Sequence, residues 1–205
     1  MKIPDNAAYK LLEKYKIPCA NWYFARNLEE AAVAAENLHF PIILKIDSPE
    51  VMHKLAAGCI RTVYHRDHLR KMFETVMGNA KRQTRKINGI IMQELISSDI
   101  ENVQEFIIGA KRDEQFGLVI MFGAGGRLTK QNDVCFRLIP ISKLDATEMI
   151  KEPFAAKLLT RHEKVADVLL KVSKLAEYEK IGELDINPLL VSDKGILAAD
   201  VRILI

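Results

Sequence analysis

The first half of the chain alternates between two hydrophobic periodicities. Residues 5–18 and 27–40 place apolar side chains at helical spacing, and residues 66–82 form a longer amphipathic segment with the same spacing. Between them lie short apolar runs bounded by turn residues or charges, which are typical of strands. The pattern predicts a smaller α+β lobe over residues 1–92. Its predicted strands are 21–25, 41–47 and 59–64.

Two of these helices begin with cap signals. Asp5 is a possible N-cap of the first helix, because its carboxylate can accept from free amides of the first turn. Asn27 and Glu30 have the spacing of a capping box at the start of the second.

From Gly89 onward strands dominate. A helical segment at 146–159 and a long amphipathic helix at 162–179 follow, and a β-hairpin closes the chain. This predicts a larger lobe over residues 93–205 with an expected ligand cleft between the two lobes. The predicted strands are 89–95, 104–112, 117–123, 133–141 and the two arms of the hairpin.

The closing hairpin carries polar residues in an apolar setting. Two apolar runs flank the turn sequence SDKG, and if Val191 pairs with Ile196 the same register places Asn187 opposite Asp200. Directly opposed residues bring their Cβ atoms to roughly 5 Å. A carboxylate and an amide at that separation can share one ion.

Side-chain alternation gives this hairpin one acidic face. Asp185 and Asn187 lie on it, whereas Leu184 and Ile186 lie on the other face. Oxygen ligands of this kind suit Mg²⁺, which keeps waters and substrate phosphates in its remaining positions. The alternative is a solvated surface in which Asp185 pairs with Arg202. The hairpin alone favours that alternative, because surface charge is commoner than metal sites.

Composition narrows the class of protein. With 205 residues and 49% hydrophobic content, the chain is large enough to bury a real core. The 30 basic and 27 acidic residues are dispersed, so the net charge of +3 does not call for a nucleic-acid partner. Three scattered cysteines favour neither a disulfide framework nor a zinc site, and a reducing cytoplasm fits them best. No apolar run approaches the roughly 20 residues of a membrane span.

Three segments contain residues that could bind or accept phosphate. Lys45 lies within an apolar strand, where it either snorkels to an edge or meets an anion. His53 and Lys54 precede a small-residue stretch ending at Gly58, and a neutral imidazole can accept a phosphoryl group. A single histidine is more often a surface or helix-end residue. Gly125 and Gly126 follow a strand without forming a P-loop motif, so they are either a plain turn or a phosphate cradle.

Taken in order, several motifs resemble one family. The chain looks like the ATP-grasp β subunit of ADP-forming (NDP-forming) acetyl-CoA synthetases, and the similarity runs nearly from end to end. This resemblance implies an ATP-grasp fold. The motifs are LLEKYKIP, PIILKIDSPEVMHK, IIMQEL, QEFIIGAKRDEQFGLVIMFGAGG, DVCFRLIPI and GELDINPLLVSDKGILAADVR.

The resemblance also implies a reaction. Such enzymes convert acyl-CoA, ADP and phosphate reversibly to the acid, coenzyme A and ATP. Coenzyme A and the acyl group belong to an α subunit or domain, so this chain is expected to be an acid-thiol ligase subunit that needs an α partner. The part of the reaction expected of this chain is Mg²⁺-dependent binding of ATP or ADP and transfer of the phosphoryl group.

Site residues follow from the motifs that match. His53 corresponds to the histidine proposed to relay phosphate to the nucleotide, and the segment after Ser48 is then expected to move. Asn187 and Asp200 match magnesium ligands, with Asp185 beside them. Nucleotide-binding candidates are Lys45 at the phosphates, Glu94 and Leu95 at the adenine, Glu105 at the ribose, and Gly58, Gly125, Gly126 and Arg137; Lys54 joins His53 as a catalytic candidate.

Three functions remain open at this stage. The first is the enzyme subunit just described, and the second is an ATP-grasp nucleotide-binding or regulatory module that has lost phosphotransfer. Departures from the family pattern bear on the second: Cys59 follows Gly58 in place of a second glycine, and Thr129 and Lys130 stand where a glutamate is usual. The third is another ATP-grasp enzyme that makes an acyl phosphate by itself, and it is disfavoured because no segment is left to form an acid-binding domain.

Overall fold

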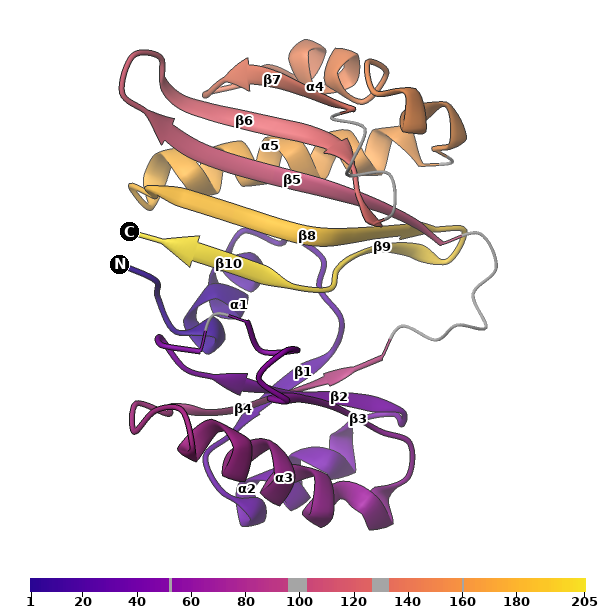
Figure 1. Cartoon of the computed structure of the whole chain (residues 1–205). Coiled ribbons are helices and arrows are strands. Elements are labelled where there is room, and N and C mark those ends of the chain that lie inside the picture. Colours follow the sequence, from indigo (N-terminus) through magenta and orange to yellow (C-terminus); the bar gives the residue numbers. More distant parts are fainter. Residues whose placement is uncertain (52, 96–102, 127–132, 160) are drawn as a thin grey trace. The chain divides into compact units, whose positions relative to one another are not determined.

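The computed structural model of the chain describes residues 1–51, 53–95, 103–126, 133–159 and 161–205 (Figure 1). Two compact units make up the chain. The smaller comprises Pro4–Ala7 and Ala20–Ser97, and the larger comprises Met1–Ile3, Ala8–Cys19 and Ser98–Ile205.

These units differ in detail from the predicted division at residues 92 and 93. That boundary falls inside strand β4 (Gly89–Glu94), which pairs along its length with β2 (Ile42–Asp47). Because β4 is hydrogen-bonded to β2 along its whole length, all of β4 belongs to the smaller unit. Helix α1 (Asp5–Lys14) begins in the smaller unit, and its residues from Ala8 onward belong to the larger one.

The smaller unit is built on a four-stranded antiparallel sheet. Its order is β1 (Trp22–Ala25), β4, β2 and β3 (Ile60–Val63). Figure 1 shows α2 (Leu28–Ala34) and α3 (Leu69–Lys81) covering one face of this sheet. Short 3-10 turns lie at Ala35–Asn37 and Arg66–His68. Buried side chains of strands and helices form the core between them, among them Leu44, Ile46, Phe73 and Val76.

The larger unit is built on a six-stranded sheet. Along it run β10 (Val201–Leu204), β8 (Glu183–Ser192), β5 (Gln104–Asp113), β6 (Gly117–Ala124) and β7 (Val134–Leu138), and β9 (Gly195–Ala198) pairs with β8. Helices α4 (Lys143–Met149) and α5 (His162–Tyr178) cover one face, with a 3-10 turn at Phe154–Leu158 (Figure 1). Neighbouring strands of both described sheets are antiparallel, which agrees with the predicted α+β class.

The predicted N-cap of the first helix is wrong. Asp5 is the first helical residue, and the cap is the carboxylate of Asp47, which accepts from the amides of Asp5 at 2.9 Å and Asn6 at 3.1 Å. The cap comes from the end of β2, so a local sequence signal cannot reveal it. The predicted cap at Asn27 is confirmed, since its side chain accepts from the amide of Glu30 at 2.8 Å.

Two boundaries also differ from the sequence pattern. Strand β7 ends at Leu138, three residues before the predicted end, and the expected helix over 146–159 divides into α4 and the 3-10 turn. Ser142 starts α4 early through a capping box with Asp145. Thr129 and Lys130 lie outside the described residues. Within the described ranges, every helix is too short or too polar to cross a bilayer.

Candidate functional site

The closing hairpin has the predicted register. Val191 pairs with Ile196, and β8 and β10 continue the same alignment with Ile186 opposite Val201. Between the two ladders, the amide of Asn187 donates to the carbonyl of Asp200 at 3.2 Å. The hairpin therefore brings Asn187 and Asp200 together, as its alternation and turn length predict.

Asp185 adds a third oxygen-bearing side chain at this end of the larger unit. Burial raises the pKa of Asp185; the charge of Arg202 lowers it, and the charges of Glu183 and Asp200 raise it further. The net pKa is raised, with burial as the largest cause, and the guanidinium of Arg202 forms an ion pair with Glu183. Arg202 lies opposite Asp185 in the β8–β10 ladder, but its ion pair is with Glu183, unlike the Asp185–Arg202 pair of the surface alternative.

Tyr9 supports the Asp200 segment from helix α1. Its hydroxyl lies 3.2 Å from the carbonyl oxygen of Ala199, to which it donates, and 3.5 Å from Oδ1 of Asp200. The side chain is fully buried. Sequence reasoning missed this residue, because an aromatic side chain at helical spacing from Leu12 is expected simply to fill a core.

The donor chemistry of this hairpin fits a magnesium ion. One carboxylate and one amide are both oxygen donors, and Mg²⁺ is commonly held by one or two protein groups together with water and phosphate. Among the described residues, no group of three or more His, Cys, Asp or Glu side chains could hold a metal by itself. A magnesium ion held by these two side chains would take its remaining ligands from water and phosphate.

Lys45 is buried in the middle of strand β2. Only 7% of the residue is exposed, and its ammonium donates to the side-chain oxygen of Gln93 at 2.8 Å. Gln93 was not among the predicted site residues, although a polar residue inside the apolar strand 89–95 carries the same signal as Lys45. Together they place a buried cation and a buried amide on the sheet face opposite to Leu44 and Ile46, which belong to the hydrophobic core.

Glu94 ends strand β4 in a dense set of hydrogen bonds. Its carboxylate accepts from the amide and the ring of His39 at 2.8 and 2.9 Å, and from Asn21 at 3.2 Å. Burial raises the pKa of Glu94, but these hydrogen bonds outweigh it and the net pKa is lowered. The amide of Leu95 donates to Pro41. The amide of Glu94 donates to the carbonyl of Asn21, so the amides of both residues are already engaged and an adenine here would meet the ionised carboxylate of Glu94 instead.

Glu105, Gly125 and Gly126 meet in the larger unit. The amide of Gly125 donates to the carbonyl of Glu105 at 2.8 Å. A Cβ atom on Gly125 would lie 2.8 Å from the carbonyl carbon of Glu105, and one on Gly126 would lie 2.5 Å from its carboxylate. Gly125 therefore has no room for a Cβ beside the Glu105 backbone, and Gly126 has a φ of +58°, at which any other side chain is strained. The close contact with Glu105 explains why residues 125 and 126 are glycines, independently of any bound ligand.

Arg137 on β7 is engaged with carboxylates near α4. It forms ion pairs with Glu152 and Glu148, which hold its pKa above its usual value, with the Glu152 hydrogen bond as the largest cause. A nucleotide phosphate would compete with these carboxylates for the guanidinium of Arg137. Its predicted binding role remains a prediction.

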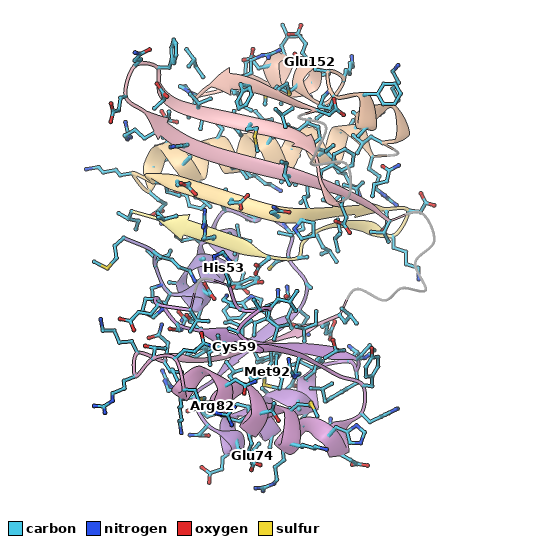
Figure 2. All side chains as sticks on the ribbon, in the orientation of Figure 1. His53, Cys59, Glu74, Arg82, Met92 and Glu152 are labelled. Atoms are coloured by element: carbon cyan, nitrogen blue, oxygen red, sulfur yellow. The ribbon has the colours of Figure 1, made fainter. Side chains whose placement is uncertain are left out.

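His53 lies on the segment that joins β2 to β3. Figure 2 shows it on that segment, with Cys59 where the chain returns to the sheet. The histidine is exposed, whereas Cys59 is buried and Gly58 has a φ of +65°. Cys59 has no positive φ, so the position where the family usually has a second glycine does not require one here. Movement of this segment remains a prediction.

The predicted residues fall into two groups. Lys45, His53, Lys54, Gly58, Glu94 and Leu95 belong to the smaller unit, and Glu105, Gly125, Gly126, Arg137, Asp185, Asn187 and Asp200 to the larger. A pocket of about 630 Å³ in the smaller unit is lined by none of the first group. A pocket on the larger sheet does reach Asp185.

Comparison with known proteins defines the class. The ATP-grasp domain family matches residues 2–205, and the chain belongs to this family. It is 36% identical to the β subunit of acetate–CoA ligase (ADP-forming) I from Pyrococcus furiosus, over 97% of this chain and 89% of that protein. The resemblance drawn from the motifs is thereby confirmed.

Two further relatives show the extent of the match. Acetate–CoA ligase (ADP-forming) I from Archaeoglobus fulgidus is 36% identical over 95% of this chain, which spans only 30% of that relative. A structure of Ca. Korarchaeum cryptofilum dinucleotide forming acetyl-coenzyme A synthetase 1 covers all of this chain and 92% of its own, with 34% identity and a TM-score of 0.82. It was solved with coenzyme A and Mg-AMPPCP, its phosphohistidine segment pointing towards the nucleotide binding site.

Proposed function

We propose that this chain is the β subunit, or β part, of an ADP-forming acyl-CoA synthetase. It binds ADP or ATP with Mg²⁺ and transfers a phosphoryl group between a phosphohistidine and the nucleotide. The full reaction, acyl-CoA plus ADP plus phosphate to acid, coenzyme A and ATP, requires an α partner that handles coenzyme A and the acyl group. The β subunit relative and the nucleotide-bound structure support this proposal.

The chemistry suits the residues of this chain. Phosphoryl transfer needs charge neutralisation and in-line positioning more than covalent chemistry from the protein. Lys45 supplies a fixed cation for nucleotide phosphate, and the exposed imidazole of His53 accepts and returns the phosphoryl group. Asn187 and Asp200 would hold Mg²⁺, which supplies further charge neutralisation at the phosphates when bound.

The observation that carries the proposal is the hairpin register that opposes Asn187 to Asp200. It was predicted from the residues alone, and it also matches the magnesium ligands implied by the family motifs. Because the hairpin register and the family motifs both point to Asn187 and Asp200, a nucleotide–metal site is favoured over a solvated surface.

Titration of the full chain with ADP by calorimetry tests this site. We expect binding that is strong with Mg²⁺ and weak without it, because Asn187 and Asp200 would hold the ion and the ion would neutralise the phosphate charge beside Asp200. Equal heats and affinities in the two titrations would contradict the metal site. Absence of binding in both would favour a degenerate module, or a nucleotide site that only the α partner completes.

A further inference from the structure

The segment that joins β2 to β3 carries His53 and is called the His53 segment below. Hydrogen bonds hold it to the rest of the smaller unit on both sides of the histidine. At its start, the hydroxyl of Ser48 donates to the carbonyl of Lys86 at 2.7 Å. At its end, the side-chain amide of Asn79 donates to the carbonyl of Gly58 at 2.8 Å. The exposed His53 lies between these two attachments.

A third attachment lies directly beside the histidine. The ammonium of Lys54 contacts the carboxylate of Asp5, and the two side chains are only 12% and 4% exposed. The ion pair between Lys86 and Glu50, at the start of the segment, is 72% and 46% exposed. An exposed pair contributes little, whereas removing one partner of a buried pair leaves an uncompensated buried charge. Lys54 is therefore the stronger of the two ionic attachments.

Asp5 is itself held in place. Its amide donates to Asp47, a fully buried residue at the end of β2. Asp47 also accepts from the amide of Asn6 at 3.1 Å and from the side chain of Asn88 at 3.2 Å. A chain of buried polar contacts thus connects the end of β2, through Asp5, to the residue that follows His53.

We propose that Lys54 is a positioning residue whose ion pair with Asp5 is the latch that sets the resting position of His53. The role differs from that of a catalytic cation, because the Lys54 ammonium meets a protein carboxylate and not the reacting group. The functional half of the proposal rests on the phosphoryl transfer proposed above: the latch aligns His53 in its resting position and opens when the histidine moves. Correct alignment raises the rate of transfer and leaves nucleotide affinity unaffected.

Amide hydrogen exchange of the full chain, resolved by NMR, tests the latch without any enzyme assay. The amides of Ala57, Gly58 and Cys59 donate to carbonyls of the segment at 2.8 to 3.0 Å and report on its opening. In Lys54→Met we expect these amides to exchange at least about tenfold faster, because local opening becomes easier. Amides of strand β4 keep their rates.

Matched variants separate the latch from general destabilisation. Asp5→Asn is expected to have the same effect as Lys54→Met, and the double variant no additional effect, because both changes break one contact. Lys86→Met, at the exposed pair, should leave the three amides unchanged. Lys54→Arg keeps the charge and should restore part of the protection of the three amides. If Lys54→Met does not fold, exchange in Lys54→Arg is measured in its place.

Two results would overturn the latch. One is wild-type exchange in both Lys54→Met and Asp5→Asn, and the other is an equal acceleration in Lys86→Met. In phosphoryl transfer with an α subunit, Lys54→Met should lower kcat by about tenfold or more with the KM for ADP unchanged, and Lys54→Arg should recover part of it. A rise in KM alone would instead indicate direct nucleotide contact. If the wild-type chain transfers no phosphate, the proposed function fails, while the exchange rates still decide the latch.

Discussion

Replacing His53 with asparagine is expected to abolish phosphoryl transfer by this chain. Asparagine keeps a polar side chain of similar reach but has no imidazole nitrogen to accept phosphate. With an α subunit and ATP labelled in the γ-phosphate, the wild-type chain should acquire an acid-labile label at His53. In His53→Asn the label should fall to background and ATP formation by about a thousandfold or more.

His65→Asn is the matched control. His65 is also exposed, belongs to the same unit and lies outside the His53 segment, so its replacement should leave labelling and turnover unchanged. Normal turnover by His53→Asn would remove the relay role from this residue. The phosphate would then pass directly between the α subunit and the nucleotide.

Replacing Asp200 with alanine should affect nucleotide binding only when magnesium is present. We expect Mg-ADP affinity to fall by at least about a hundredfold, since even losing a group that only supports a metal ligand costs about 10- to 100-fold. Metal-free ADP should bind as well as before or better, because a carboxylate that repels the polyanion has been removed. Calorimetry with and without Mg²⁺ measures both affinities.

Asp193→Ala provides the control within the same hairpin. Asp193 lies in the exposed turn between β8 and β9, so its loss removes a carboxylate without touching the Asn187 and Asp200 positions. Equal losses of affinity for Mg-ADP and metal-free ADP in Asp200→Ala would show that Asp200 only stabilises the hairpin. Its contact with the buried Tyr9 makes a thermal melt of this variant a necessary companion measurement.

Local patterns predicted the parts of the site that depend on nearby residues. The hairpin register follows from strict alternation and a short turn, because a slip of one residue would expose Leu184 and Ile186. The exposed position of His53 and the buried position of Lys45 also agree with their sequence surroundings. In these cases, neighbours within a few residues determine the environment.

Contacts between distant residues could not be predicted in this way. Asp47 caps a helix 42 residues earlier in the chain, and Lys54 meets Asp5 across 49 residues. Nothing in the spacing of these charges signals their pairing, so the sequence predicts Asp5 as a cap and does not reveal its contact with Lys54. Residues 8–19 likewise join the larger unit through tertiary packing that follows no boundary signal in the sequence.

The most direct test of the central claim is ATP formation by the reconstituted enzyme. This chain, mixed with an α subunit of an ADP-forming acyl-CoA synthetase that co-elutes with it, is supplied with acetyl-CoA, ADP, phosphate and Mg²⁺. We predict that ATP forms in the mixture and that neither subunit forms it alone. A stable complex that binds Mg-ADP yet forms no ATP from acetyl-CoA or other acyl-CoA substrates would contradict the claim and identify the chain as a nucleotide-binding module without phosphotransfer.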